Sequence, residues 1–343
     1  MRKICKVTLN EESFAAKCGD LLLDSALMNG VDLPHDCRSG ICGACRVRLV
    51  KGRVFGGQEG EEMIHACQAR IISDIEIATE PVPDQVSVWA RVAAIFRLSP
   101  DVFGVEIELP KPIHYLPGQY CKLQFQGFPA RNYSPTYPLE GPPNKLLLHF
   151  HIRQLSEGVV SSELGQGIRE GHRVRITGPF GSAFLRPDHG GRIVLASSGT
   201  GFAPMWSVAV GAIMERPQRE LVFLVAARSL QSLYMLAALC RLALFPKVII
   251  IPIVSEPQSV SSAIRAGRPN DHLPVLSPSD VVYAAGSPSM TESVGRIAKA
   301  AGAKCYTDPF TSNAKLTDQE KLAQRVTGWF NQTSRNYQRI VSG

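Results

Sequence analysis

The chain has 343 residues, of which 45% are hydrophobic and 20% are charged. This balance is typical of globular proteins, excludes a disordered or collagen-like chain, and the length allows two or three domains. The apolar run Val248–Val254 is short and contains Pro252, and no run reaches the roughly 18 to 20 residues of a membrane-spanning helix. The first residues are basic, but no apolar core follows them. A signal peptide is therefore not predicted, and we expect a cytoplasmic protein.

The formal net charge of +7 is unevenly distributed along the chain. Residues 1–84 hold ten Lys and Arg against thirteen Asp and Glu, so the remainder carries the whole positive excess. A basic body can attract nucleic acid, but these Lys and Arg are scattered and no basic run is interleaved with aromatic residues. We therefore expect no nucleic-acid partner and no membrane span.

Nine cysteines, an odd number without an export signal, indicate reduced thiols and a possible metal site. Four of them follow the pattern C-x4-C-x2-C with a fourth after a gap: Cys37, Cys42, Cys45 and Cys67. This is the spacing of plant-type [2Fe-2S] sites, and Gly40 and Gly43 allow the tight turns that such a loop needs. Zinc sites usually use paired short knuckles, whereas only one short pair occurs here. The spacing predicts these four cysteines as ligands of a [2Fe-2S] cluster.

The residues around the cysteines predict strands over Lys3–Leu9 and Ile71–Ala78 and a short helix over Leu21–Asn29 that ends at Gly30. Residues 1–82 resemble a plant-type ferredoxin throughout. The resemblance implies a β-grasp fold for this first domain.

A second, β-rich domain is predicted over residues 85–187, after a linker that contains Pro81 and Pro83. Val86–Phe96 and Val102–Leu109 alternate as strands do. Leu146–Arg153 alternates as well, which predicts Leu146, Leu148, Phe150 and Ile152 on one face and His149, His151 and Arg153 on the other.

Arg131-Asn132-Tyr133-Ser134 forms an R-x-Y-S motif, and it resembles the flavin-binding strand of the ferredoxin-NADP reductase superfamily. The resemblance implies an antiparallel β-barrel in which Arg131 meets the FAD pyrophosphate, Tyr133 packs on the isoalloxazine and the Ser134 hydroxyl lies near flavin N5. A planar guanidinium suits a phosphate and a flat aromatic suits a flat ring. The plainer alternative is a barrel strand with a surface Arg and a packed Tyr.

Two further segments match that superfamily in the expected order. Gly158-Val159-Val160-Ser161-Ser162 resembles the second flavin motif, in which small and hydroxyl residues begin a helix that holds the pyrophosphate. Gly178-Pro179-Phe180-Gly181 closes the domain as in the superfamily. The cofactor implied is FAD rather than FMN, and its expected contacts include Gly158, Val160, Ser161, Ser162 and, through the neighbouring strand, His151.

A third domain is predicted over residues 190–310. The strand Arg192–Ser197 leads into a glycine-rich turn and a helix that extends to Met214, an arrangement that lets a dinucleotide pyrophosphate approach backbone N–H groups. Strands over Leu221–Ala226, Val248–Pro252 and Val281–Ala285 alternate with helical segments. This alternation predicts a doubly wound parallel sheet, and the whole chain is predicted to be an α/β multidomain protein.

The glycine-rich turn is G-T-G-x-A-P, the form that the reductase superfamily uses for NAD(P), and the resemblance implies nucleotide contacts by Gly199, Thr200, Gly201 and Pro204. Ala285-Gly286-Ser287-Pro288-Ser289-Met290 is similar to the C-G-x-P-x-M segment beside the nicotinamide, which implies contacts by Gly286, Pro288 and Met290. Ala285 stands where that superfamily commonly has cysteine, and we therefore expect an altered rate of hydride transfer. Arg228 follows the Leu221 strand where the adenosine ribose is contacted. Arg228 can hold a 2′-phosphate, but NADH-using relatives share it, so we expect NADH and leave NADPH open.

Tyr306–Phe310 resembles the last strand of the superfamily, in which an aromatic residue shields the flavin. The residues expected at the reacting atoms are Ser134, Asp308 and Phe310. The remaining residues, 311–343, predict a helical extension, because Thr317–Glu320 reads as a capping box and an apolar stripe follows at helical spacing. This extension either packs on its own body or serves for docking or dimerisation.

The order ferredoxin, flavin domain and nicotinamide domain resembles the reductase components of multicomponent bacterial oxygenases. The resemblance implies an NAD(P)H:acceptor oxidoreductase that passes electrons from NADH through FAD and the cluster to a terminal oxygenase, an aromatic-ring hydroxylase or a related monooxygenase. Such a chain converts a two-electron donor into one-electron deliveries. The alternative is the same relay serving a non-oxygenase acceptor such as a deoxysugar dehydrase.

Overall fold

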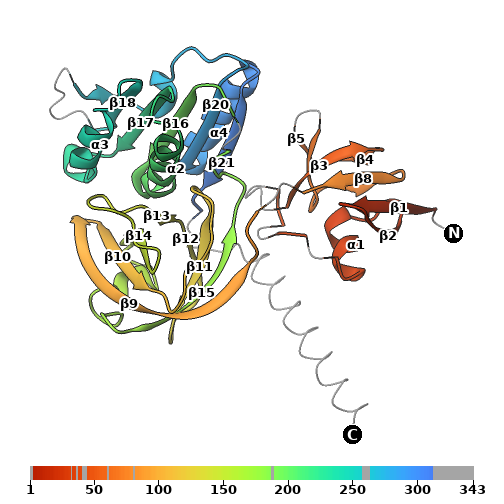
Figure 1. Cartoon of the computed structure of the whole chain (residues 1–343), viewed down its shortest axis with the longest axis horizontal. Helices are drawn as coiled ribbons and strands as arrows, with labels where there is room; N and C mark the ends of the chain where they lie inside the picture. The colour runs from red at the N-terminus through yellow and green to blue at the C-terminus, as the bar shows by residue number, and fades with distance from the viewer. Residues whose placement is uncertain are drawn as a thin grey trace, which may run out of the picture. The chain divides into compact units, whose positions relative to one another are not determined.

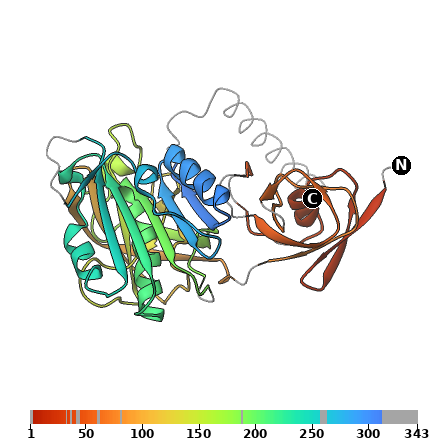
Figure 2. The same cartoon turned by 90° about the horizontal axis from the view of Figure 1, so that it is seen from above.

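The computed structural model consists of three β-sheet domains in chain order (Figures 1 and 2). It describes residues 3–31, 33–35, 38–40, 45–59, 62–79, 82–186, 189–256 and 263–311. The predicted extension beyond Thr311 and two predicted cluster ligands, Cys37 and Cys42, lie outside these residues. The α/β multidomain class is confirmed. Among the described residues, no helix has both the length and the apolar character needed to cross a bilayer.

The first domain is a β-grasp in which a six-stranded mixed sheet is covered by one helix. The sheet order is β2-β1-β8-β3-β6-β5, and β4 pairs separately with β7. Leu22, Leu23 and Ala26 of the helix pack into the core with apolar side chains of the sheet. The elements are β1 (Ile4–Leu9), β2 (Glu12–Lys17), α1 (Leu22–Met28), β3 (Arg46–Lys51), β4 (Val54–Phe55), β5 (Gln58–Glu59), β6 (Met63–His65), β7 (Arg70–Ile71) and β8 (Ile75–Ala78).

The strand predicted over Ile71–Ala78 is divided into β7 and β8. Ser73 and Asp74 stand between them and bond to backbone elsewhere: the Arg53 N–H donates to Ser73 Oγ at 2.8 Å, and the Lys6 N–H donates to Asp74 Oδ1 at 2.8 Å. Short polar side chains of this kind compete with the ladder hydrogen bonds of a strand. The single-strand prediction was wrong at Ile72, Ser73 and Asp74, which lie outside both strands.

The second domain is a near-closed antiparallel barrel of seven strands in the order β12-β11-β15-β9-β10-β14-β13. The two strands at the ends of this order, β12 and β13, are joined by Ser134 alone, so the sheet returns on itself there. Apolar side chains such as Phe125 and Phe150 fill the interior. The strands are β9 (Val86–Ser99), β10 (Val102–Glu108), β11 (Tyr120–Phe125), β12 (Arg131–Tyr133), β13 (Pro135–Thr136), β14 (Leu147–Arg153) and β15 (Arg173–Phe180).

The third domain is a doubly wound sheet whose six strands are all parallel, in the order β19-β18-β17-β16-β20-β21. The chain builds outward from β16 in one direction and then in the other, which places a topological switch point between β16 and β20. The elements are β16 (Ile193–Ser198), α2 (Phe202–Glu215), β17 (Leu221–Ala227), α3 (Leu236–Leu242), β18 (Val248–Val254), β19 (Arg265–Ala266), β20 (Val281–Gly286), α4 (Pro288–Ala300) and β21 (Lys304–Pro309).

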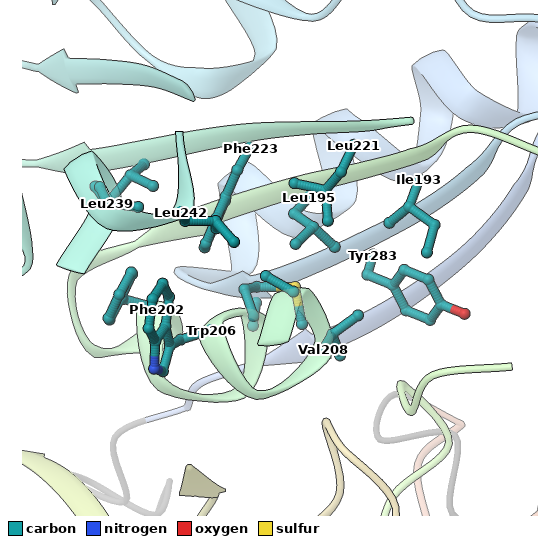
Figure 3. Close-up of a cluster of buried hydrophobic side chains, with 14 of the residues drawn as sticks. Ile193, Leu195, Phe202, Trp206, Val208, Leu221, Phe223, Leu239, Leu242 and Tyr283 are labelled. Atoms are coloured by element: carbon teal, nitrogen blue, oxygen red, sulfur yellow. The ribbon is translucent and has the colours of Figure 1, made fainter. Parts of the chain in front are cut away.

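Both faces of this sheet are apolar and covered by helices. Figure 3 shows one face, where Leu195 and Phe223 of the strands meet Phe202 of α2 and Leu239 of α3. Val194 and Leu224 point to the opposite face and pack with residues of α4. Successive strand residues point to opposite sides, so continuous apolar strands are buried on both. The carboxyl edge of the sheet is thereby left for polar and glycine residues.

Candidate functional site

The glycine-rich turn lies at the switch point and brings the ends of β16 and β20 close together. A Cβ added to Gly201 would lie 2.1 Å from the carbonyl oxygen of Ala285. Gly286 has φ +128°, and a Cβ there would lie 2.3 Å from Ser198 Oγ. These two glycines are therefore required by the approach of the two strands. Gly199, with φ +56°, faces open space instead, which fits a nucleotide that approaches the turn.

The residues that follow each glycine begin helices. Thr200 lies within the 3-10 turn Gly199–Gly201, and Pro204 is the third residue of α2, where a missing N–H costs no helix bond. Pro288 is the first residue of α4. Met290 is only 5% exposed and packs in the core beneath α4, so its side chain is part of the packing.

Ser134 and Asp308 meet where the flavin barrel closes against the last strand of the nucleotide sheet. Ser134 is buried, and its hydroxyl donates to the Asp308 carboxylate. Asp308 lies beside Ala285 in the pairing of β21 with β20. The Phe310 N–H donates to the Gly286 oxygen at 2.7 Å. The three residues expected at the reacting atoms thus lie around the switch point.

The Asp308 carboxyl is the unusual ionisable group of this junction. The residue is partly exposed, but its Oδ2 is buried and has no hydrogen-bond partner within the described part of the chain. Burial raises the pKa of Asp308 to about 7, although the hydrogen bond from Ser134 opposes this shift. An orphaned buried oxygen indicates that a further polar group belongs at this position, and bound flavin with nicotinamide fits that requirement.

The R-x-Y part of the flavin motif forms β12, the strand before the closing residue. The Arg131 Nη1 donates to the Ala130 oxygen at 2.8 Å. Tyr133 is partly buried, and burial raises the pKa of its phenol to about 12. Tyr133 is therefore a neutral aromatic surface at physiological pH, as a flat ring partner requires.

The segment predicted to begin a helix forms only one 3-10 turn, Ser161–Glu163, so that part of the prediction was wrong. Leu164 is extended and Gly165 has φ +80°, which ends the turn. Both hydroxyls serve the loop itself: the Leu155 N–H donates to Ser161 Oγ at 3.1 Å, and Ser162 Oγ donates to the Gly158 oxygen at 2.7 Å. Val160 is buried in the barrel core.

His151 points out of the barrel as the alternation predicts, yet it is only 8% exposed because the third domain covers it. Its ring stacks on Phe202 with centroids 6.1 Å apart, and Nδ1 shares a hydrogen bond of 3.1 Å with the Tyr234 hydroxyl. Burial, with a smaller effect from His149, lowers the pKa of His151 to about 3. His151 is therefore neutral and offers no positive charge to a phosphate.

The two predicted cluster ligands that the structure describes, Cys45 and Cys67, are both buried. The Ala66 N–H donates to the Cys45 oxygen at 3.0 Å, which holds the two cysteine segments side by side. The Gln68 Nε2 donates to the Arg38 oxygen at 2.8 Å and so ties the beginning of the cysteine loop to the Cys67 segment. Two buried cysteines held in neighbouring segments fit the predicted cluster, whose other predicted ligands, Cys37 and Cys42, lie outside the described residues.

Arg46 follows Cys45 directly and contacts the nucleotide domain. Its guanidinium carbon lies 4.9 Å from the ring centroid of Tyr306 on β21. Arg186, in the connection between barrel and nucleotide sheet, lies 3.9 Å from the same centroid. Tyr306 is two residues before Asp308, so the strand that carries Asp308 also contacts the residue that follows Cys45.

Arg228, the residue expected at the adenosine ribose, forms an ion pair with Glu256, which the sequence analysis did not identify. Its Nε donates to Glu256 Oε1 at 2.6 Å. Glu256 lies two residues beyond β18, at the carboxyl edge of the same sheet. The signal that could have found it is an acidic residue two positions after an apolar strand.

Three domain families match successive parts of the chain. They are a 2Fe-2S iron-sulfur cluster binding domain over residues 6–71, an oxidoreductase FAD-binding domain over 90–184 and an oxidoreductase NAD-binding domain over 195–296. The three matches confirm the predicted cofactor set.

Individual proteins match most of the chain. The chain is 30% identical over 320 residues to a ferredoxin–NAD(P)+ reductase component of a naphthalene 1,2-dioxygenase system from Pseudomonas putida, covering 88% of this chain and 96% of that one. It is 31% identical to the reductase subunit of an aromatic O-demethylase from an Amycolatopsis species, over 74% of this chain and 80% of that one. A crystal structure of an Amycolatopsis cytochrome P450 reductase superposes with TM-score 0.67 and 27% identity, over 90% of this chain and 99% of that one.

Proposed function

The chain belongs to the family of NAD(P)H-dependent reductase components of oxygenase systems, and we propose that it passes electrons from NADH through FAD and a [2Fe-2S] cluster to a terminal oxygenase. The observation that carries the proposal is the junction of Ser134 with Asp308, because it joins the flavin motif to the switch point of the nucleotide sheet. When bound, FAD would supply the chemistry that links a two-electron nicotinamide donor to a one-electron cluster.

The residues of the chain serve this relay by binding and positioning. In the proposal Arg131 and Tyr133 hold the flavin, with the loop around Gly158, Ser161 and Ser162. Gly199 leaves room for the nucleotide pyrophosphate at the start of α2. Ser134 and Asp308 hold hydrogen bonds at the reacting edge, and Phe310 covers it. The rate of hydride transfer then depends mainly on how closely the nicotinamide is held against the flavin.

The remaining assignments belong to the same proposal. Cys37, Cys42, Cys45 and Cys67 are the cluster ligands, and the domains extend over 1–82, 85–187 and 190–310, followed by the extension 311–343. A cytoplasmic location fits, because exposed and cluster-binding thiols are kept reduced there. The Arg46–Tyr306 contact supports a direct path from the flavin edge to the cluster.

The first test is an anaerobic titration of the purified protein with NADH and, in parallel, with NADPH, followed by absorbance. We expect NADH to bleach both the flavin and the cluster bands. Addition of a terminal oxygenase component should then reoxidise the cluster. If the flavin alone bleaches, electrons do not reach the cluster; if nothing bleaches, the proposed donor is wrong.

A pair of cysteine variants makes this test specific. Cys67→Ser removes a proposed ligand and should abolish cluster bleaching and delivery to the acceptor while the flavin still bleaches. Cys240→Ser changes an exposed cysteine of α3 and should leave both signals unchanged. Equal behaviour of the two variants would contradict the ligand assignment.

The identity of the acceptor is the part of the proposal that rests least on the residues of this chain and most on its relatives. The relatives described above serve a dioxygenase and a demethylase, and they give no support to a deoxysugar dehydrase acceptor. Reduction of a dehydrase but of no oxygenase, measured with the same reduced protein, would reverse this preference.

A further inference from the structure

Arg228 and Glu256 stand together at the carboxyl edge of the nucleotide sheet. β17 and β18 are parallel and pair Ala227 with Val254. The pairing continues past both strands, because the Glu256 N–H donates to the Arg228 oxygen at 2.9 Å. The neighbouring β16 ends at the glycine-rich turn on the same edge. In sheets of this kind the residue that follows the second strand meets the ribose of the adenosine.

The two side chains form an ion pair that a ligand can reach. Arg228 Nε lies 2.6 Å from Glu256 Oε1, and the side chains are 72% and 50% exposed. The hydrogen bond from Arg228 to Glu256 raises the pKa of the guanidinium further above its ordinary value. Ser229, the next residue in the chain, shares a hydrogen bond of 3.2 Å with Ser232.

We propose that Glu256 is the residue that selects against a 2′-phosphate on the nucleotide, by occupying Arg228 and by placing a second negative charge beside the ribose. This inference rests on the proposed function and adds the nucleotide specificity of the same site. An arginine at this position by itself favours a 2′-phosphate. A ribose 2′-hydroxyl carries no charge and can donate to the carboxylate, whereas a 2′-phosphate would be repelled by it.

The same two strands provide a matched control at their opposite ends. Glu220, just before β17, pairs with Lys247, just before β18, at 3.4 Å. These side chains are 59% and 50% exposed, so the pair resembles Arg228–Glu256 in charge and accessibility. It lies at the amino edge of the sheet, away from the glycine-rich turn.

The experiment compares the binding of adenosine 2′,5′-bisphosphate and 5′-AMP to the full chain with its cofactors, by calorimetry. The native protein should prefer 5′-AMP. Glu256→Gln should shift the ratio of the two dissociation constants about tenfold toward the bisphosphate, because one carboxylate charge near a phosphate dianion is removed. Glu220→Gln should leave the ratio unchanged. In the double variant Glu256→Gln with Arg228→Gln the gain should disappear.

Three results would overturn the inference: an unchanged ratio in Glu256→Gln, the same shift in Glu220→Gln, or a shift that persists without Arg228. Failure of the native protein to bind either nucleotide would overturn it as well, since no ribose would then lie beside Glu256. Failure of the proposed function looks different. In that case 5′-AMP binds and the ratio responds to Glu256, but NADH does not bleach the flavin.

Discussion

A buried carboxyl at the junction of two domains has chemical consequences at the scale of single residues. Asp308 has a pKa of about 7, so near neutral pH it exists in both protonation states. The protonated form can donate a hydrogen bond from the junction, and the ionised form only accepts. The Ser134 hydroxyl is the group that hydrogen-bonds to Asp308. The neighbouring Ala285 is fully buried and has no thiol that could form a hydrogen bond there.

The pH dependence of stability provides a test of Asp308. Its folded pKa of about 7 lies above the ordinary 3.8, so the folded state binds more protons between these values and stability falls as pH rises through this range. The largest slope for one group is about 1.4 kcal/mol per pH unit. Asp308→Asn cannot ionise. We therefore expect its melting temperature relative to the native holoprotein to rise from pH 4 to about pH 7 and to level off above.

Ser134→Ala serves as the companion variant, because it removes the hydrogen bond that lowers the pKa of Asp308. The decline in stability should then extend to higher pH than in the native protein. A melting difference between Asp308→Asn and the native protein that does not change with pH would show that Asp308 is not the titrating group.

At the scale of elements, the close approach of β16 and β20 determines where the site lies. The two strands end in small residues, and Ser198 Oγ accepts from the Ser287 N–H at 3.0 Å across the switch point. Gly201 and Gly286 permit this contact because neither carries a Cβ. A glycine pattern that is usually assigned to ligand binding thus also has a packing role in this domain.

Two Gly→Ala variants test whether the effect of an added methyl group depends on the close contact between β16 and β20. Gly286→Ala places a Cβ 2.6 Å from the Ser198 backbone oxygen in a left-handed conformation, and we expect a loss of about 3 kcal/mol in domain stability together with weaker nucleotide binding. Gly295→Ala, within α4, meets no atom closer than 4.0 Å. It should stabilise the domain by up to about 1 kcal/mol. Thermal unfolding and nucleotide titration measure both, and equal stability of the two variants would contradict the packing argument.

At the scale of the whole molecule, the first domain and the rest of the chain carry net charges of opposite sign. Residues 1–84 are net acidic and the rest of the chain is net basic. Complementary charge mainly accelerates encounter between partners. The acidic domain is therefore expected to steer the protein toward a positively charged face of its acceptor.

Salt is the test of this steering. We expect the second-order rate of acceptor reduction to fall on the order of tenfold between low and high ionic strength, because salt screens the attraction. Reduction of the cluster from the flavin of the same molecule requires no encounter, and in single-turnover measurements it should change little. A salt-independent rate of delivery would indicate an apolar docking face instead.

Much of this protein is determined by local sequence. The cysteine spacing, the R-x-Y-S motif and the turn Gly199–Gly201 each act through a few consecutive residues, and they identified three domains in their order. Strand and helix periodicity placed most of the elements that it predicted within a few residues of their observed bounds. It failed at Ser73 and Asp74 and at Ser161, where side-chain hydrogen bonds to backbone replaced regular structure.

Only the tertiary structure decided which distant residues meet. Asp308 lies far along the chain from Ser134, His151 is buried by a residue of another domain, and Glu256 reaches Arg228 only because β17 and β18 are neighbours. No local pattern contains these contacts, because they depend on sheet order and on the packing of one domain against another. The sequence by itself determined the chemistry that the chain carries, and the fold determined the protonation of Asp308 and His151 and the pairing of Arg228, since burial and proximity are properties of the folded chain.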